Sequence, residues 1–142
     1  MDIFSWMLLL VFLLMLAMLS VSVSGVKKIG ALEAVQALSP DKLPKVSIVF
    51  SALNEEESIA NALNSLLELD YPDFEIIAIN DRSTDKTGEI LASLAKQNQR
   101  LRAVHIDALP EGWLGKNHAL DVGSQQAGGK YIVFTDADVM FD

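Results

Sequence analysis

Two aspartates after an apolar segment are the residues best suited to chemistry. The apolar run 131–134 is followed by Thr135, Asp136, Ala137 and Asp138. Side chains alternate between faces in an extended chain, so we expect Asp136 and Asp138 to point the same way, with Cα atoms roughly 6.5 Å apart. Mg²⁺ prefers one or two carboxylates and completes its shell with water and substrate phosphates. The pair is therefore suited to a cation that also holds a diphosphate. The alternative is two solvated acids in a turn.

The charge balance restricts the partners of the chain. Its 142 residues include 11 Lys and Arg against 19 Asp and Glu, which gives a net charge of −8. Non-specific nucleic-acid binding requires a basic surface, so we expect no nucleic-acid partner. The chain has no cysteine. This excludes disulfides, thiolate metal sites and thiol nucleophiles together.

The N-terminal segment predicts a membrane anchor. Residues 3–23 contain no charged side chain, and as a helix they would span about 31 Å, enough to cross a bilayer. A cleavable signal peptide is the competing interpretation, because the Ser-Val-Ser at 22–24 and the following Gly25 resemble a cleavage site. We favour a retained anchor, since only Asp2 precedes the segment and the apolar run exceeds the usual length of a signal peptide.

The charges that flank this segment predict its orientation. Lys27 and Lys28 follow it directly, so the positive-inside rule places the rest of the chain in the cytoplasm, and we expect the bacterial inner membrane. The expected organisation is an anchor over 1–26, a juxtamembrane linker over 27–44 with a helical stretch around 29–38, and a folded domain over 45–142.

From Val46 onward, strand-like and helix-like segments alternate. Short apolar runs bounded by polar turns predict buried strands, and apolar residues at helical spacing predict helices. The alternation predicts an α/β, Rossmann-like fold with a mainly parallel sheet. The expected strands are 46–51, 74–80, 101–106 and one that begins at Tyr131. The expected helices are 55–67 with Glu55, Glu56 and Glu57 in its first turn, one capped by Ser83, Thr84 or Asp85, and 117–126.

Polar clusters follow three of the four expected strands. They are residues 51–55, residues 80–82, and the pair Asp136 and Asp138. Parallel sheets bind ligands at the carboxyl ends of their strands, beside the point where strand order reverses, so these clusters predict one site. The chain has neither a G-x-G-x-x-G segment after the first strand nor a Gly-rich turn that ends in Gly-Lys-Ser/Thr. Phosphate would therefore be held by metal and side chains.

Several motifs together resemble a known family. Val-Ser-Ile-Val-Phe-Ser-Ala-Leu-Asn-Glu-Glu (46–56), Asn-Asp-Arg-Ser-Thr-Asp-Lys-Thr (80–87) and Thr-Asp-Ala-Asp (135–138) resemble the nucleotide-sugar half of family 2 glycosyltransferases with the GT-A fold. Gly-Trp-Leu-Gly-Lys-Asn-His-Ala-Leu (112–120) is similar to a Gly-Trp-x-Gly-Lys-x-x-Ala segment. That segment belongs to a membrane-associated subgroup that includes hopanoid- and carotenoid-pathway transferases.

The resemblance implies a role for individual residues. Glu55 and Asp81 would contact the nucleoside, Asp81 by accepting from a base N–H or a ribose hydroxyl. Asp136 would reach the ribose or the metal, and Asp138 would bind Mg²⁺ or Mn²⁺ that bridges the diphosphate. Lys116 would contact the diphosphate, although a solvated lysine at a helix start is the alternative. The nucleotide-sugar-binding residues implied in this way are Ala52, Leu53, Glu55, Asp81, Lys116, Asp136, Ala137 and Asp138. The metal ligands would be Asp138 and Asp136.

The sequence departs from the family pattern in two respects. Ser51 and Leu53 stand where many members carry Pro and Tyr, which leaves the choice between a UDP- and a GDP-linked sugar open. The acceptor half, with its general base, would lie beyond Asp142. We therefore expect this chain to be the donor-binding portion of a transferase, with no turnover by itself. The anchor and the Gly-Trp segment suggest a lipid acceptor.

Two other functional classes remain open. A phosphatase of the haloacid dehalogenase type also uses Asp-x-Asp, but there the motif should follow the first strand rather than the last. A membrane-tethered interaction domain without catalysis would fit the same fold. Metal-dependent nucleotide binding distinguishes the transferase from this last alternative. His105 and His118 have no partner at metal-ligand spacing, so we expect them to pack or face solvent.

Overall fold

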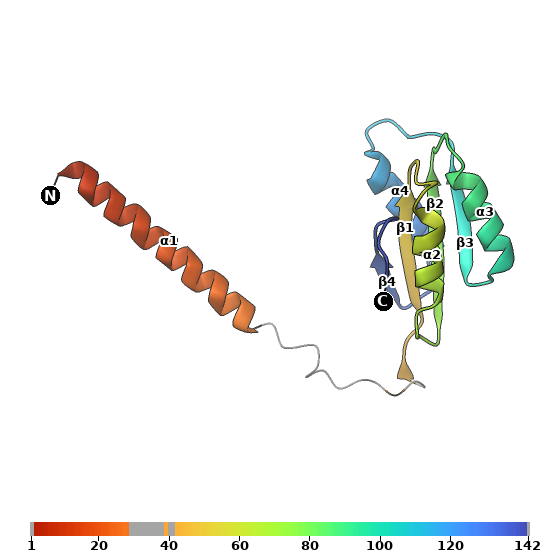
Figure 1. Ribbon diagram of the computed structural model, residues 1–142, viewed down its shortest axis with the longest axis horizontal. Coiled ribbons are helices and arrows are strands. Elements are labelled where there is room, and N and C mark those ends of the chain that lie inside the picture. Colours follow the sequence, from red (N-terminus) through yellow and green to blue (C-terminus); the bar gives the residue numbers. More distant parts are fainter. Residues whose placement is uncertain (1, 29–38, 40–41, 142) are drawn as a thin grey trace. The chain divides into compact units, whose positions relative to one another are not determined.

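The computed structural model describes residues 2–28, 39 and 42–141 (Figure 1). The chain separates into two compact units, Met1–Leu38 and Ser39–Asp142. We describe each unit by itself. The helical stretch expected around residues 29–38 lies outside the described residues.

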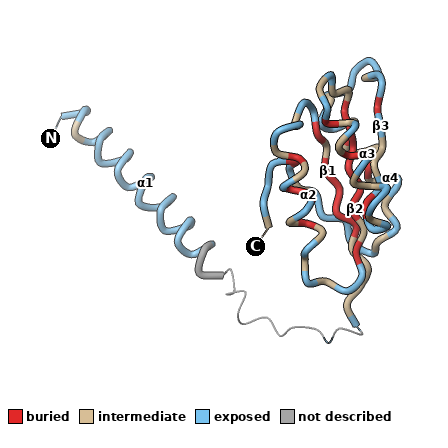
Figure 2. Tube along the Cα trace, turned by 45° about the vertical axis from the view of Figure 1, so that its right-hand side comes forward, coloured by how far each residue is buried: buried red, intermediate tan, exposed pale blue. Residues whose placement is uncertain are grey.

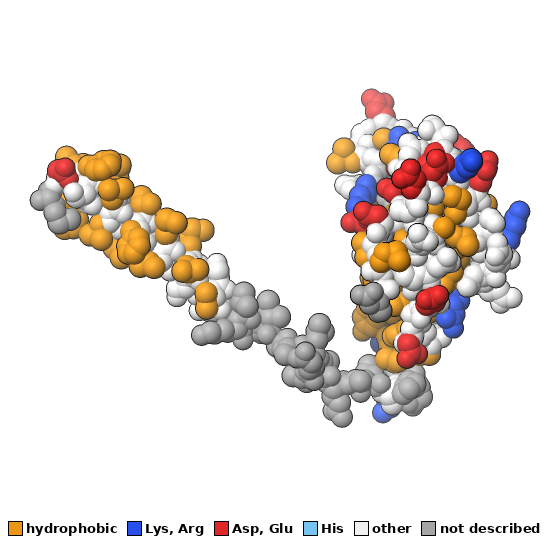
Figure 3. All heavy atoms as spheres, viewed as in Figure 1, with side chains coloured by type: hydrophobic (Ala, Val, Ile, Leu, Met, Phe, Trp, Pro, Cys, Tyr) orange, Lys and Arg blue, Asp and Glu red, His pale blue; other side chains and the backbone are white. Residues whose placement is uncertain are grey.

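The first unit contains the predicted apolar helix. Helix α1 (Ile3–Lys28) is strongly apolar, and its large apolar side chains between Ile3 and Val23 are exposed (Figures 2 and 3). Its first turn is capped by Asp2, whose Oδ1 accepts the Ser5 N–H at 3.0 Å. The segment Ile3–Gly25 is long and apolar enough to cross a membrane, as judged by length and composition. An exposed apolar surface of this extent requires an apolar environment.

The second unit is built around a four-stranded parallel sheet. Its strands are β1 (Val46–Ala52), β2 (Phe74–Asp81), β3 (Leu101–Ile106) and β4 (Tyr131–Phe134), and their order in the sheet is β3-β2-β1-β4. The helices that alternate with them are α2 (Ile59–Leu67), α3 (Thr87–Gln97) and α4 (Gly115–Gln126). The predicted alternation and the parallel sheet are confirmed. Because β4 returns to the free side of β1, strand order reverses between β1 and β4.

The helices cover the two faces of the sheet. Ile48 and Phe50 of β1 pack with α2 and α3 on one face, whereas Val49 packs on the opposite face with Ala119 of α4. This division follows from the alternation of side chains along a strand. The two central strands, β1 and β2, are almost fully buried (Figure 2), while all four residues of β4 are exposed. The centre of the sheet is therefore buried, and its edge at β4 is exposed.

Helix α2 begins later than its acidic residues suggested. The prediction that Glu55, Glu56 and Glu57 form its first turn is wrong, because the helix starts at Ile59. Asn54 has a φ of 57°, which turns the chain before a helix can start. The N–H groups of Glu55 and Glu56 then bond to side chains of another loop instead of entering helical geometry.

Glu75 joins three segments at the amino end of the sheet. Its Oε1 accepts from the Ser47 hydroxyl at 2.7 Å and from the Gly128 N–H at 2.7 Å. Its Oε2 lies 3.2 Å from Lys45 Nζ. Partial burial raises the pKa of Glu75, but the bonds from Ser47, Gly128 and Lys45 outweigh this and hold the pKa below its usual value. The carboxylate thus stabilises the start of β1, the start of β2 and the entry to β4.

We expect Glu75→Gln to lower the melting temperature at neutral pH by roughly 4 °C, because the amide cannot pair with Lys45. The folded-state pKa lies below the unfolded-state pKa of about 4.3, so this stabilisation is complete above the unfolded-state value and is lost as the pH falls through the folded-state value. Thermal melts of both proteins at about pH 7 and about pH 3 check this. The difference should shrink at the lower pH. A difference that does not change with pH, or an equal loss in the exposed control Glu68→Gln, would contradict the assignment.

Candidate active site

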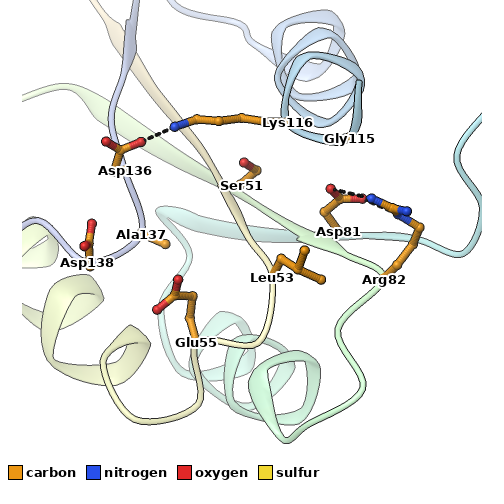
Figure 4. A pocket seen from close by; sticks show the side chains of 10 residues that line it. All are labelled: Ser51, Leu53, Glu55, Asp81, Arg82, Gly115, Lys116, Asp136, Ala137 and Asp138. Carbon is orange, nitrogen blue, oxygen red and sulfur yellow. Dashed lines mark hydrogen bonds and ion pairs between the residues drawn. The ribbon is translucent and has the colours of Figure 1, made fainter. Parts of the chain in front are cut away.

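One cavity lies at the carboxyl ends of β1, β2 and β4. It occupies about 520 Å³ beside the reversal of strand order, where the sequence predicted a site. Charged side chains gather at this end of the second unit (Figure 3). The cavity is lined by Ser51, Leu53, Glu55, Asp81, Arg82, Gly115, Lys116, Asp136, Ala137 and Asp138 (Figure 4).

The structure brings together all but one of the residues singled out from the sequence. The exception is Ala52, which is 1% exposed and packs in the core with α2 and α3. Neighbouring side chains on β1 point to opposite sides, so Ser51 lines the cavity in its place. The sequence predicts Arg82 only as a member of the polar cluster 80–82 and Gly115 only as part of the segment 112–120, and it assigns neither residue a role in binding.

Asp81 and Arg82 form one wall of the cavity. Asp81 ends β2 and is 3% exposed. The Arg82 guanidinium donates from Nε to Asp81 Oδ1 at 2.7 Å and from Nη2 to Oδ2 at 3.1 Å. These hydrogen bonds raise the pKa of Arg82 above its usual value. Both carboxylate oxygens that were expected to face a nucleoside therefore already accept from an internal cation.

Two backbone features make this arrangement possible. Arg82 has a φ of 59°, which folds its side chain back over Asp81, whereas successive side chains of a strand would diverge. A Cβ at Gly115 would lie 2.6 Å from Arg82 Nη2 and 3.0 Å from Asp81 Oδ2. Glycine at this position therefore lets α4 begin directly beside the ion pair. No local sequence signal predicts either contact.

Lys116 and Asp136 form a second ion pair across the cavity. Lys116 lies in the first turn of α4, and its ammonium reaches Asp136 Oδ1 beyond the end of β4 (Figure 4). The two side chains are 59% and 58% exposed. Lys116 is thus a residue of the cavity rather than a lysine directed into bulk solvent.

The two aspartates share the cavity for a reason other than the predicted one. Strand β4 ends at Phe134, and Ala137 and Asp138 lie in a turn, so the alternation of an extended chain does not apply. Ala137 is 6% exposed and packs into the core next to α2 and α3. It anchors the turn, and Asp136 and Asp138 are exposed on either side of it.

The donor set fits a hard divalent cation that is completed by substrate. Among residues 2–28, 39 and 42–141, no three His, Asp or Glu side chains are grouped so that they could hold a metal alone. A pair of carboxylates is the set that Mg²⁺ or Mn²⁺ uses when water and phosphate oxygens supply the other ligands. Asp136 and Asp138 would hold such an ion.

A network of hydrogen bonds joins the loop 53–58 to the loop 82–86. The Glu55 N–H donates at 2.8 Å to the hydroxyl of Thr87, a fully buried residue. Burial raises the pKa of Asp85, but bonds from Thr87 and from the Glu56 N–H hold it below its usual value. Asp85 Oδ1 also accepts the Thr87 N–H, but the N-cap residue of α3 is Lys86, which makes no side-chain cap bond, so Asp85 is not the expected cap. The remaining bonds between the loops are Asn54 N–H to Ser83 Oγ, Thr84 N–H and Oγ1 to Asn54 Oδ1, and Lys86 N–H to Glu56 Oε2.

This network fixes the relative position of two cavity walls. The first loop carries Leu53 and Glu55, and the second carries Arg82. Ser83 and Thr84, expected as helix caps, take part in the loop-to-loop bonds instead. These hydrogen bonds therefore hold the two loops together beside the cavity.

Both histidines lie outside the cavity. His105 Nδ1 is 2.7 Å from Asn80 Nδ2, and its Nε2 is 3.0 Å from Asp107 Oδ1. His118 packs edge-on against Trp113 with ring centroids 5.4 Å apart, and its Nδ1 is buried without a hydrogen-bond partner among the described residues. These positions agree with packing or solvent-facing roles.

Two known proteins are similar to about two thirds of this chain. The beta-monoglucosyldiacylglycerol synthase of Nostoc sp. is 42% identical over 98 residues, which cover 68% of this chain and 20% of that protein. The poly-beta-1,6-N-acetyl-D-glucosamine synthase of Staphylococcus epidermidis is 37% identical over 97 residues, which cover 68% of this chain and 22% of that protein. The chain thus spans about a fifth of the length of these curated relatives.

A solved structure and a family model agree with these relatives. The mannosyltransferase of Pyrobaculum calidifontis in complex with GDP-Man and Mn²⁺ superposes with a TM-score of 0.62 at 29% identity. The superposition covers 74% of this chain and 30% of that one. The model described as glycosyl transferase family 2 matches residues 47–142. With its GT-A-like sheet and the motifs gathered in one cavity, the chain belongs to glycosyl transferase family 2.

Proposed function

We propose that the protein is part of a membrane-anchored glycosyltransferase whose residues 45–142 bind a nucleotide-diphosphate sugar with Mg²⁺ or Mn²⁺. The observation that carries this proposal is the cavity at the carboxyl ends of β1, β2 and β4. It joins the motifs of four separate segments at the point where parallel sheets bind ligands. The Pyrobaculum mannosyltransferase, whose structure holds GDP-Man and Mn²⁺, supports the choice of ligand class.

The geometry suggests a division of roles within the cavity. Asp136 and Asp138 hold the divalent cation, which offsets charge on the departing diphosphate. Lys116, at the start of α4, contacts the diphosphate. Glu55 and Asp81, held by the joined loops and by Arg82, form the nucleoside side of the cavity. In this division the phosphates lie on the β4 side of the cavity, and the nucleoside lies on the β2 side.

The N-terminal unit suggests the location and the acceptor. Residues 1–26 would anchor the protein, residues 27–44 would link it to the domain, and Lys27 and Lys28 would lie on the cytoplasmic side of a bacterial inner membrane. An anchored domain meets acceptors at the membrane surface. The Nostoc relative, by its name, makes a glucosylated diacylglycerol. We therefore propose a lipid acceptor.

Titration calorimetry of the 142-residue chain in detergent tests the donor site. We would add UDP, GDP or pyrophosphate, each with Mn²⁺ and each with EDTA. We expect one nucleotide to bind only with Mn²⁺, and at least about tenfold more tightly than pyrophosphate, because the nucleoside side adds contacts. A chain that melts cooperatively yet binds no nucleotide with Mn²⁺ would refute the proposal. It would favour the tethered domain without catalysis. Binding of pyrophosphate as tight as that of the nucleotides would refute the nucleoside assignment.

A further inference from the structure

The cations of the cavity are already neutralised by its own carboxylates. Arg82 pairs with Asp81, and Lys116 pairs with Asp136. The second pair involves a carboxylate that is proposed to hold the divalent cation. By contrast, Asp138 forms no salt bridge within the described part of the chain. The ammonium of Lys116 thus lies at one half of the proposed metal site.

We propose that Lys116 is an exchangeable counter-ion of Asp136 that couples metal binding to nucleotide binding. This inference rests on the proposed function. Before any ligand binds, the ammonium of Lys116 neutralises Asp136. With a divalent cation and a diphosphate bound, Asp136 would hold the cation and Lys116 would donate to the phosphate oxygens. Metal and nucleotide therefore bind together far better than either binds alone.

The exposure of the pair makes this exchange inexpensive. More than half of each side chain is exposed, at 59% for Lys116 and 58% for Asp136. Exposed ion pairs contribute little to stability, so separating this one costs little. A divalent cation without a nucleotide, however, must approach Asp136 against the positive charge of Lys116. The lysine consequently opposes binding of the metal alone.

The start of α4 favours the second position of Lys116. Gly115, the first residue of α4, lines the cavity, and the helix has no side-chain cap at this end. Its first N–H groups are left for other acceptors, and the helix dipole places partial positive charge there. Positive charge from the helix disfavours an isolated ammonium and favours a phosphate group. A diphosphate would therefore be attracted by both the helix end and Lys116.

The exchange predicts opposite effects of one substitution. Lys116→Met should tighten binding of Mn²⁺ alone by between about two- and fivefold, because the competing charge is gone. The same variant should weaken binding of the nucleotide in the presence of Mn²⁺ by about tenfold, because a diphosphate contact is lost. A lysine that only contacts phosphate would change the second affinity and not the first.

Electron paramagnetic resonance of free Mn²⁺ measures the first affinity without any nucleotide or turnover. The full chain in detergent would be compared with Lys116→Met and with Lys96→Met, which removes the same charge at the exposed end of α3. Calorimetry with UDP and GDP measures the second affinity. In an Asp136→Asn background, Lys116→Met should no longer tighten Mn²⁺ binding. Thermal melts establish that each variant is folded.

The outcomes separate the inference from the function on which it rests. Tighter Mn²⁺ binding with weaker nucleotide binding, seen in Lys116→Met and not in Lys96→Met, supports the exchange. Unchanged or weaker Mn²⁺ binding in Lys116→Met overturns the exchange, even where nucleotide binding falls and the donor site stands. Absence of Mn²⁺-dependent nucleotide binding in the unmodified chain overturns the donor site itself, and the exchange with it.

Discussion

Replacing Asp138 with asparagine will weaken Mn²⁺-dependent nucleotide binding by about a hundredfold or more, which is about 2.7 kcal/mol. Asparagine keeps the shape of the side chain and removes the negative charge that a divalent cation requires. Asp138 is exposed in a turn and forms no salt bridge within the described residues. The loss should therefore leave the melting temperature unchanged. Calorimetry and a thermal melt of the same sample measure the two quantities.

The control for this substitution is Asp73→Asn. Asp73 is an exposed aspartate on the chain before β2, and it does not line the cavity. It experiences the same change in net charge, so any general electrostatic effect on an acidic protein will appear in it as well. Equal weakening in both variants would show that Asp138 has no specific role in holding the cation.

Replacing Gly129 with alanine will destabilise the second unit by about 2–3 kcal/mol, which lowers its melting temperature by roughly 10–20 °C. A Cβ at Gly129 would lie 2.6 Å from the Ser47 backbone nitrogen, 2.7 Å from Ser47 Oγ and 2.9 Å from the Val46 carbonyl carbon. Backbone atoms of a central strand cannot move aside as a flexible side chain can. Strand β4 must therefore shift away from β1.

The neighbouring glycine provides a matched control. A Cβ at Gly128 would lie 3.3 Å from Glu75 Oε1 and 3.5 Å from Lys45 Nζ, which are the ends of flexible side chains. We expect Gly128→Ala to cost less than about 1 kcal/mol. Nucleotide titration well below the melting temperature should also show weaker binding in Gly129→Ala alone, since β4 leads into Asp136 and Asp138. Equal melting temperatures for the two variants would show that β4 is not held at this contact.

The sheet and the position of its cavity could be predicted because their signals are local. The apolar residues of β2 lead directly into Asn80 and Asp81 at its carboxyl end, and polar residues also follow β1 and β4. Topological rules for parallel strands then place these ends together. Residue types and their order along the chain are enough to predict that these strand ends lie together.

The turns of the site depend on contacts that a local pattern cannot express. Three acids before an amphipathic run predict a helix start, but the N–H groups of Glu55 and Glu56 bond to side chains about thirty residues away in sequence. Arg82 enters the cavity through a positive φ that arginine seldom adopts. Asp136 and Asp138 line the same cavity because the buried methyl group of Ala137 anchors their turn, not because of strand geometry. These features follow from the assembled fold.

The strand order has a consequence for the way the protein is made. Val46 of β1 pairs with Phe74 of β2, but its other neighbour, Tyr131 of β4, is synthesised much later. The sheet β1-β2-β3 can assemble on the ribosome while one edge of β1 still lacks a partner, and such edges promote aggregation. Parallel pairing over this separation is slow. The cavity is therefore completed only when β4 joins β1, so nucleotide affinity measured on a nascent or refolding chain reports this pairing.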